Sequence, residues 1–360
     1  MKILIATNHS YMLWRFRKEL IETLSKDHEV VLSMPFVGHE DDFKGMGLRC
    51  IDTPIDRRGI DLVNDMKLIR TYRRMLDEVR PDTVITYSIK PNIYLGRLCR
   101  RRGISYFTNV QGLGTAFEKP ILSKVVSLMY RSALRSVGRV FFENSENAEY
   151  FTDRGMIPKE KAAVLPGAGV NTDEYPYVEP TGDRSVCSFL FVGRLMKEKG
   201  VDEFFDAARR IKSERGDGVR FDVVGLWEDS YEERVDSLVN DGIITFHGFK
   251  TDILPYYGMA DCVVLPSYHE GMSNVLLEGA ATGRALITSD IPGCRETVAD
   301  GVSGFLCKPK DTDSLCDAIR RFADLDPAAR REMGLMGRRL VTEGFDKRRV
   351  VEMTVKEMGL

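Results

Sequence analysis

The sequence predicts an α/β protein that consists of two tandem domains, each built on a parallel sheet. Its length of 360 residues exceeds what one hydrophobic core usually organises. Short apolar runs alternate with amphipathic, helix-like segments, an order typical of a parallel sheet covered by helices on both faces. The alternation starts again after residues 167–184, a stretch rich in Pro, Gly and acidic side chains that suits a linker.

The apolar runs define two sets of expected strands. In the first half they lie at residues 2–7, 28–33, 49–52, 83–87, 104–109 and 139–143. In the second half they lie at residues 188–192, 220–224, 243–247, 262–266 and 285–289. Helical periods separate the strands, for example over residues 13–24 and 63–79. Two such units in tandem predict an interdomain cleft that the carboxyl ends of the strands face.

The composition excludes several classes of protein. A net charge of −2 argues against a general nucleic-acid binder, so no nucleic-acid partner is expected. The seven cysteines form no Cys-x-x-Cys pair and are odd in number, which indicates reduced thiols and neither a disulfide framework nor a zinc site. No apolar run approaches the length of a signal peptide core or a membrane span. We therefore expect a cytoplasmic protein, with peripheral attachment to a membrane left open.

The segment from Glu270 to Glu278 has the clearest chemistry. A strand ending near Pro266 leads into a loop that contains Glu270, and Ser273 and Asn274 offer cap chemistry for a helix that runs to about Thr282. The backbone N–H groups of such a helix start suit a diphosphate. Carboxylates suit sugar and ribose hydroxyls, because each accepts several hydrogen bonds. The alternative interpretation is an ordinary capped helix with two solvated glutamates.

Basic residues follow the first strand of the second domain. Residues 191–200 place Arg194 and Lys199 on a strand–loop–helix turn, where two cations fit the charge of a departing nucleoside diphosphate. A solvated basic turn is the alternative. Residues 246–250 end another strand of the same domain, where a base could rest, and residues 290–296 supply a further glycine-containing loop.

These motifs together resemble a known family. Gly-Arg-Leu-x-x-x-Lys-Gly at 193–200, the two glutamates eight residues apart and the Pro-Gly loop at 292–293, in that order, are similar to the retaining glycosyltransferases of family 4. The resemblance implies the GT-B fold, two facing Rossmann-like domains. It also implies an acceptor-binding domain at 1–168, a nucleotide-sugar-binding domain at 169–345, and a last helix at 346–360 that returns to the first domain.

The resemblance also implies residue roles. Arg194 and Lys199 would hold the donor diphosphate and stabilise the leaving group, and Glu270 would contact the donor sugar. Glu278 would bind the ribose hydroxyls, with Phe249 and Lys250 beside the base. The remaining donor-binding candidates are Gly193, Gly271, Met272, Ser273, Asn274 and Val275. The donor is expected to be a UDP-sugar, with no metal and no further cofactor.

The first domain is expected to meet an anionic partner. Residues 83–142 contain ten Lys or Arg and a single acid, Glu118, so their local charge is +9 in a chain of net charge −2. A solvated helix face normally mixes both signs. The segment from Ile121 to Arg139 is predicted to be an amphipathic helix, with its cations on one side, that can lie on an anionic membrane surface. A core-packed helix with a basic outer face is the alternative. The cations are Lys124, Arg131, Arg135 and Arg139.

The acceptor side rests on segments that follow strands of the first domain. Residues 88–94 and 109–117 carry glycines and polar groups that suit a phosphate-bearing second substrate, and residues 57–59 are similar in character. With residues 14–17, they resemble a subgroup that adds N-acetylated sugars to undecaprenyl-diphosphate-linked sugars. This resemblance implies a lipid-linked saccharide acceptor on the cytoplasmic face of the inner membrane. The acceptor-binding candidates are Arg17, Arg58, Lys90, Asn92, Gln111, Gly112 and Gly114.

Other functions stay open at this point. A UDP-sugar epimerase of the same fold would need acid and base groups but no basic acceptor face. A non-catalytic, nucleotide-sugar-binding membrane adaptor would lack turnover. A dinucleotide oxidoreductase is disfavoured, because neither domain shows Gly-x-Gly-x-x-Gly after its first strand. Asp311-Thr312-Asp313 has the form of a metal-binding motif but is expected to cap a helix at residues 314–322.

Overall fold

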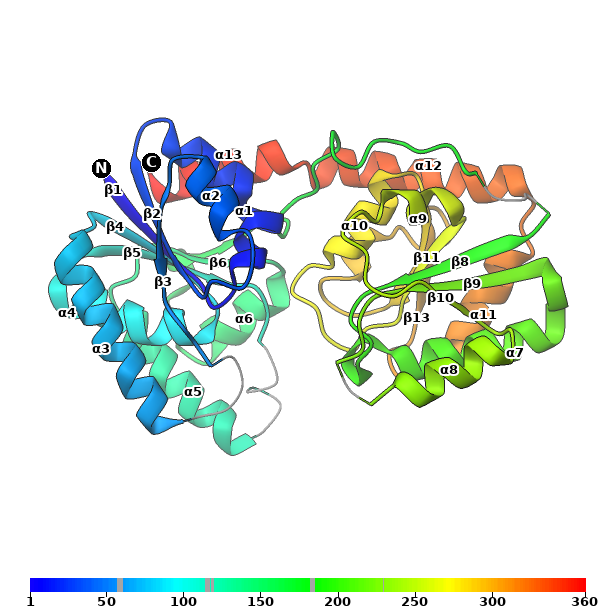
Figure 1. Ribbon diagram of the computed structural model, residues 1–360, viewed down its shortest axis with the longest axis horizontal. Coiled ribbons are helices and arrows are strands. Elements are labelled where there is room, and N and C mark those ends of the chain that lie inside the picture. Colours follow the sequence, from blue (N-terminus) through cyan, green and yellow to red (C-terminus); the bar gives the residue numbers. More distant parts are fainter. Residues whose placement is uncertain (57–60, 114–116, 118–119, 182–184, 229) are drawn as a thin grey trace. The chain divides into compact units, whose positions relative to one another are not determined.

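The computed structural model describes the chain except for residues 57–60, 114–116, 118–119, 182–184 and 229. Contacts between Cα atoms divide it into two compact units. Unit 1 comprises Met1–Ala168 and Arg348–Leu360, and unit 2 comprises Gly169–Lys347. Each unit is an α/β domain with one parallel sheet (Figure 1). The predicted fold class is therefore confirmed at the level of two parallel-sheet α/β domains.

Unit 1 contains a seven-stranded parallel sheet of order β3-β2-β1-β4-β5-β6-β7. Its strands are β1 (Lys2–Ala6), β2 (Glu29–Met34), β3 (Arg49–Asp52), β4 (Thr83–Tyr87), β5 (Ser105–Val110), β6 (Val140–Phe142) and β7 (Ala162–Val164). Alternate residues of β1 enter different cores: Ile3 and Ile5 lie in one, and Leu4 and Ala6 in the other. Because side chains alternate along a strand, two cores mean that both faces of the sheet are covered.

Helices cover both faces of the unit 1 sheet. They are α1 (Ser10–Ser25), α2 (Glu40–Gly45), α3 (Leu62–Val79), a π-helix (Pro91–Leu95), α4 (Gly96–Arg102), α5 (Pro120–Ala133), α6 (Ser145–Asp153), a 3-10 turn (Lys159–Lys161) and α13 (Lys347–Met358). The last helix carries Val351 and Met358 into the same core as Ile3 and Leu13, and Figure 1 shows α13 beside α1. The C-terminal helix is therefore part of the unit that contains the N-terminus.

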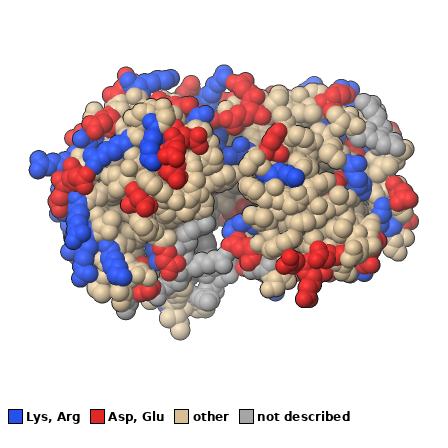
Figure 2. Space-filling view, viewed as in Figure 1, with Lys and Arg blue, Asp and Glu red and all other residues tan. Residues whose placement is uncertain are grey.

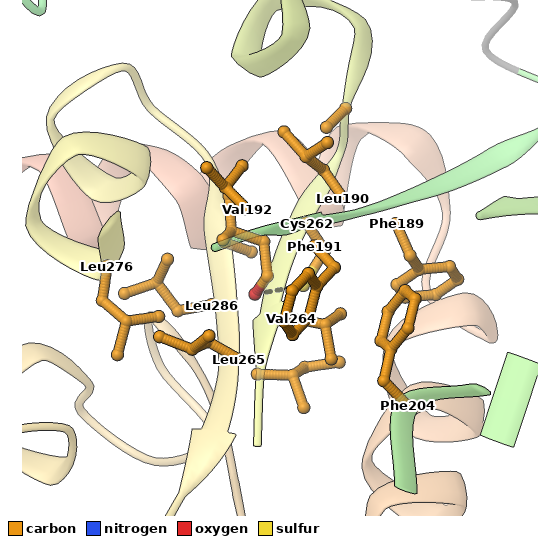
Figure 3. Close-up of a cluster of buried hydrophobic side chains, with 14 of the residues drawn as sticks. Phe189, Leu190, Phe191, Val192, Phe204, Cys262, Val264, Leu265, Leu276 and Leu286 are labelled. Carbon is orange, nitrogen blue, oxygen red and sulfur yellow. Dashed lines mark hydrogen bonds between the residues drawn. The ribbon is translucent and has the colours of Figure 1, made fainter. Parts of the chain in front are cut away.

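Unit 2 contains a six-stranded parallel sheet of order β10-β9-β8-β11-β12-β13. Its strands are β8 (Cys187–Val192), β9 (Val219–Val224), β10 (Thr245–Phe246), β11 (Cys262–Leu265), β12 (Ala285–Ser289) and β13 (Gly304–Cys307). Its helices are α7 (Val201–Arg215), α8 (Glu232–Asn240), α9 (Leu254–Met259), α10 (Asn274–Ala281), α11 (Thr312–Ala323) and α12 (Pro327–Gly344), with 3-10 turns at Lys197–Lys199, Gly216–Gly218 and Arg295–Thr297. Figure 3 shows how Phe189 and Phe191 from β8, Val264 from β11 and Leu276 from α10 fill the core between sheet and helices.

All eleven expected strands are present, with ends within two residues of the prediction. Two edge strands, β7 and β13, were not predicted. The first is only three residues long and partly exposed. The second begins at Gly304, where an added Cβ would lie 2.0 Å from the Leu286 carbonyl oxygen, so only glycine fits there. Because glycine is unfavourable inside strands, the sequence pattern did not predict this strand.

The predicted helix from Ile121 to Arg139 is wrong over its last six residues. Helix α5 ends at Ala133, and the chain then turns into β6. Leu134 and Val137 are buried in this turn and anchor it in the core. Arg135 and Arg139 therefore lie beyond the helix, and the continuous basic face that the helical spacing suggested does not form.

Candidate active site

Three loops of unit 2 lie together at the carboxyl edge of its sheet. They follow β8 (residues 193–200), β11 (266–273) and β12 (290–296). The backbone N–H of Tyr268 donates to the carbonyl oxygen of Glu198 at 2.8 Å, and that of Ser273 donates to the carbonyl oxygen of Gly293 at 2.8 Å. The three second-domain segments that carry the predicted motifs are thus connected to one another by direct hydrogen bonds.

Two glycines allow the loops to approach so closely. Gly200 has φ +70°, and a Cβ there would lie 2.0 Å from the Pro266 carbonyl oxygen. Gly293 has φ +82°, and a Cβ there would lie 2.2 Å from the Gly271 carbonyl oxygen. Any other residue would force the loops apart and adopt a strained backbone. The glycines of the two motifs therefore fix the spacing of the loop that carries Glu270.

Lys199 and Glu270 form an ion pair at the centre of this arrangement. The Lys199 Nζ lies 2.5 Å from the Glu270 Oε1, and Ser267 Oγ lies 2.8 Å from the same oxygen. The side chains are 21% and 11% exposed, so little water screens their attraction. The pair holds the Glu270 carboxylate in one orientation and keeps a cation beside it. Sequence reasoning assigned both residues to the site but not their contact with each other.

Tyr268 connects this loop to α7, the helix that follows the β8 loop. Its hydroxyl donates to Glu203, with oxygen–oxygen distances of 2.6 and 2.8 Å to the two carboxylate oxygens. Burial raises the pKa of Tyr268, and the hydrogen bond to Glu203 raises it further, so the phenol stays protonated as the donor. Lys310 Nζ lies 4.8 Å from the ring centroid. Tyr268 and Glu203 were missed from the sequence, although Tyr268 lies only two residues before Glu270.

The start of α10 lies directly after this loop. Ser273 is the N-cap residue, as predicted, but its side chain makes no capping hydrogen bond, so the predicted cap chemistry is wrong on that point. Ser273 and Met272 are buried, while Gly271, Asn274 and Val275 are partly exposed. A helix start whose N-cap side chain does not cap retains backbone N–H groups for an anion.

Glu278 lies on α10 and is only 9% exposed. The hydroxyl of the fully buried Tyr257, from α9, lies 3.1 Å from its Oε2. A buried carboxylate is costly unless hydrogen bonds compensate it, so Glu278 is held by the fold. Together with the burial of Glu270, this excludes the interpretation of two solvated glutamates on a plain helix.

Arg194 has a different partner. It forms an ion pair with Glu228 and its side chain is 54% exposed. The backbone beside it pairs with the loop after β9, since Leu195 N donates to the Leu226 carbonyl oxygen at 2.7 Å. The predicted cations thus lie on one loop but differ in environment: Lys199 faces Glu270, and Arg194 faces Glu228.

Aromatic side chains surround the end of β10. Phe249 is 52% exposed and Lys250 is exposed, as suits residues that border a ligand. The Trp227 ring stacks on Phe246, with centroids 5.0 Å apart and an interplanar angle of 27°. The loop after β9 and the loop after β10 are connected, because Gly225 N donates to the Gly248 carbonyl oxygen at 3.0 Å. Trp227 was not predicted as part of this surface.

In unit 1, Arg17 is already paired. Its Nη2 lies 2.8 Å from Glu143 Oε1, and its guanidinium lies 5.3 Å from the centroid of the Tyr87 ring. Both charged side chains are nearly buried, at 10% and 11% exposure. The burial raises the pKa of Tyr87, and the charge of Arg17 partly offsets this rise.

The other acceptor candidates that the structure describes follow β4 and β5. Lys90 Nζ is 2.9 Å from Asp65 Oδ1, and Tyr94 donates to the other oxygen of Asp65 at 2.8 Å. Asn92 is buried and its Nδ2 donates to the Asn109 carbonyl oxygen at 2.8 Å. Gln111 and Gly112 follow β5 and are partly exposed. Arg58 and Gly114 lie outside the described residues.

The basic segment of unit 1 is partly neutralised by the fold. Lys90 pairs with Asp65, Arg102 with Asp77 and Arg139 with Glu357, and all three carboxylates come from outside residues 83–142. Figure 2 shows Lys and Arg side chains along the outer edge of unit 1, over α3 and α4. The segregation of charge in the sequence is therefore larger than the segregation on the folded surface.

Two further findings concern metals and membranes. Among the described residues, no three His, Cys, Asp or Glu side chains lie together as a metal site would require. Asp311 caps α11 by accepting from Ser314 N at 2.9 Å, as predicted. No helix in the described part of the chain has the length and hydropathy needed to cross a membrane.

Comparison with known proteins identifies the family of the chain. Residues 187–324 match the family described as Glycosyl transferases group 1, and residues 14–168 match the Glycosyl transferase 4-like domain. An Escherichia coli UDP-Gal:alpha-D-GlcNAc-diphosphoundecaprenol alpha-1,3-galactosyltransferase is 30% identical over 79% of this chain and 77% of its own. A Campylobacter jejuni N,N'-diacetylbacillosaminyl-diphospho-undecaprenol alpha-1,3-N-acetylgalactosaminyltransferase is 23% identical over 89% of this chain and 88% of its own.

Solved structures show the same fold. Anabaena HepE, in complex with UDP and glucose, superimposes with a TM-score of 0.82 at 15% identity, over 100% of this chain and 99% of its own. A sucrose-phosphate synthase from Thermosynechococcus elongatus has a TM-score of 0.78 at 18% identity, over 99% of this chain and 98% of its own. The fold and the family matches thus define a glycosyltransferase of the GT-B class. The chain belongs to the family 4, or group 1, glycosyltransferases.

Proposed function

We propose that this glycosyltransferase moves an N-acetylhexosamine from a UDP-sugar to a hydroxyl of a polyprenyl-diphosphate-linked saccharide during the assembly of a surface polysaccharide or glycan. The observation that carries the donor half is the largely buried Lys199–Glu270 pair beside the start of α10. The acceptor half is supported by the two bacterial relatives whose names specify undecaprenol-linked diphospho-sugars.

Unit 2 supplies the donor chemistry in this proposal. The acceptor oxygen bonds to the anomeric carbon of the donor, and the bond from that carbon to UDP breaks with its electron pair on the diphosphate. Lys199, Arg194 and the N–H groups at the start of α10 stabilise the developing charge. Glu270, oriented by Lys199 and Ser267, accepts hydrogen bonds from the sugar hydroxyls.

The proton of the acceptor hydroxyl passes to an oxygen of the departing diphosphate, and the anomeric configuration is retained. No metal takes part in this scheme, because protein cations and the helix start meet the phosphate charge. Glu278, held by Tyr257, binds the ribose, and Phe249 with Lys250 borders the uracil. Unit 1 binds the lipid-linked saccharide, and the enzyme lies on the cytoplasmic face of the membrane as a peripheral protein.

The test is a transfer assay with defined substrates. The chain is incubated with a panel of UDP-sugars and a short-chain polyprenyl-diphosphate-linked saccharide, with and without EDTA, and UDP release and product anomer are measured. We expect acceptor-dependent UDP release, an unchanged anomeric configuration and no effect of EDTA. Interconversion of UDP-sugars without an acceptor would instead establish an epimerase.

The site assignment has its own control. Glu270→Ala should abolish transfer, whereas Glu232→Ala, an exposed glutamate on α8, should leave it intact. Equal activity of the Glu270→Ala variant and the parent chain would refute the donor site.

A further inference from the structure

A pocket in unit 1 is lined by none of the donor-binding or acceptor-binding candidates. It has a volume of about 980 Å³ and is formed by the end of α5, the end of α6 and the segment that leads into the 3-10 turn at Lys159–Lys161, with Arg100 from α4. Its buried lining includes Leu134, Met156 and Ile157. The volume is in the range of small-molecule and headgroup sites.

Four cations line this pocket against a single acid. They come from three separate segments, so no sequence window predicts the cluster. The cations are Arg100, Arg131, Arg135 and Lys159, and the acid is Asp153. Since like charges repel, a cluster of this balance favours an anionic occupant.

The four cations fall into two pairs. Arg131 is fixed by the backbone, donating to the Gly155 carbonyl oxygen at 3.0 Å and to that of Arg154 at 2.5 Å, and Arg100 donates to the Ser132 carbonyl oxygen. Arg135 and Lys159 are exposed, and within the described residues neither forms an ion pair. The first pair is held in place, and the second pair is available to a ligand.

Helix α5 lies at the lower edge of unit 1 in Figure 1. It carries exposed apolar side chains, one of which, Leu128, also lines the pocket. Ile121, Val125 and Leu128 are 83%, 47% and 62% exposed. At about 3.6 residues per turn they fall within roughly 60° of one another. The face that α5 buries in the core, with Val126 and Tyr130, is on the opposite side.

We propose that this pocket binds the phosphate headgroup of an anionic phospholipid while the Ile121–Val125–Leu128 stripe enters the bilayer surface. Leu128 belongs to both features, since it is exposed on the stripe and also lines the pocket. A phosphate in the pocket would therefore place its acyl chains beside the stripe. Exposed apolar residues flanked by cations are typical of helices that lie in the interface of anionic membranes.

This inference rests on the proposed function, which needs the enzyme at a membrane, but names a site and a ligand class. It replaces the basic helix face expected from the sequence. Arg139 pairs with Glu357 and contributes nothing to the surface in question, while Arg100 and Lys159, which lie outside the segment from Ile121 to Arg139, do. Lys124, on the same helix, adds a cation near the stripe.

The test is binding of the full chain to vesicles without any sugar substrate. Vesicles of phosphatidylcholine alone and with phosphatidylglycerol are sedimented with the parent chain and with Arg135→Glu/Lys159→Glu. We expect binding only to the anionic vesicles, weakened by roughly 30-fold or more in the variant, because each lost surface cation weakens membrane binding by about fivefold. High salt screens the attraction between the cations and the vesicles, so the binding that remains depends on the apolar stripe. Ile121→Ser/Leu128→Ser should weaken this remaining binding.

A matched control separates the pocket from overall charge. Lys26→Glu/Lys356→Glu changes the net charge of unit 1 by the same amount at two exposed lysines elsewhere. It should bind almost as the parent does, and equal loss in both double variants would overturn the pocket assignment. Binding of the parent to neutral and anionic vesicles alike would also overturn it.

Transfer to a soluble, short-chain acceptor distinguishes this inference from the proposed function. The Arg135→Glu/Lys159→Glu variant should retain that activity, which shows that it is folded. Loss of transfer in the parent chain itself would defeat the proposed function and leave the vesicle result standing on its own.

Discussion

Each unit contains a nearly buried pair of a cation and a carboxylate, yet the two pairs have different surroundings. Lys199 and Glu270 belong to loops that glycines bring together, beside a helix start with no side-chain cap. Arg17 and Glu143 connect α1 to the end of β6, and Arg17 also covers the Tyr87 ring. The comparison teaches that burial of an ion pair does not by itself indicate a site. The backbone around the pair decides whether it serves a ligand or the core.

The largest expected effect is on catalysis at the unit 2 pair. Lys199→Ala should lower kcat by about 10²–10³-fold, because it removes one donor to the developing diphosphate charge and leaves Glu270 without its cation. Single-turnover transfer assays with saturating UDP-sugar measure this. Lys197→Ala, an exposed lysine of the same motif, is the matched control and should behave as the parent does.

The unit 1 pair should instead govern stability. Arg17→Ala leaves Glu143 nearly buried without its partner, and we expect the free energy of unfolding to fall by about 3–5 kcal/mol. Urea denaturation measures the change. In a double-mutant cycle, Arg17→Met/Glu143→Gln should recover a large part of it. If Arg17→Ala kept full stability but lost only affinity for the acceptor, Arg17 would be a ligand contact and the contrast between the pairs would fail.

A smaller effect is expected where Tyr268 holds the loop of the unit 2 pair. Tyr268→Phe removes the hydrogen bond to Glu203, which is worth about 1.5–3 kcal/mol for a charged acceptor. We expect kcat/KM to fall by about tenfold, since the loop that orients Glu270 loses one of its attachments. Tyr256→Phe in α9, whose hydroxyl is not part of this loop, serves as control. A loss of stability with unchanged kcat/KM would show that Tyr268 only supports the fold.

The meeting of the three loops in unit 2 could be predicted, because each motif is contiguous in the sequence. The motif from Gly193 to Gly200 and the segment from Glu270 to Glu278 each combine a strand end, a loop and a helix start. Parallel strands bring their carboxyl ends to one edge, so the motifs had to meet. What the sequence could not show is which groups pair, since the Lys199–Glu270 contact depends on how closely Gly200 and Gly293 let the loops approach.

The unit 1 surface was harder to predict for a physical reason. Helical spacing extended α5 to Arg139, but burial of Leu134 and Val137 ends the helix earlier. Charge counting along residues 83–142 also ignored Asp65, Asp77 and Glu357, which fold back onto the segment. Windows of sequence measure local charge, whereas a folded surface combines segments that are distant in the chain.

The smallest expected effect is a pH dependence of the stability, and it comes from Tyr87, whose ring lies beside Arg17 of the unit 1 pair. Burial raises the pKa of Tyr87 in the folded chain, whereas in the unfolded chain it ionises near its ordinary value of about 10. The contribution of Tyr87 to the free energy of unfolding is therefore fully present below pH 10. Stability falls as the pH rises above this value, because the unfolded state loses the phenol proton first. At pH 10.5 the loss from this one phenol should be below about 1 kcal/mol. Comparing Tyr87→Phe with the parent by urea denaturation at pH 9 and 10.5 isolates it, and the variant should lose less stability over that interval. An identical pH dependence in both chains would mean that Tyr87 is no more protected than an exposed tyrosine, and that the core around Arg17 and Glu143 admits water.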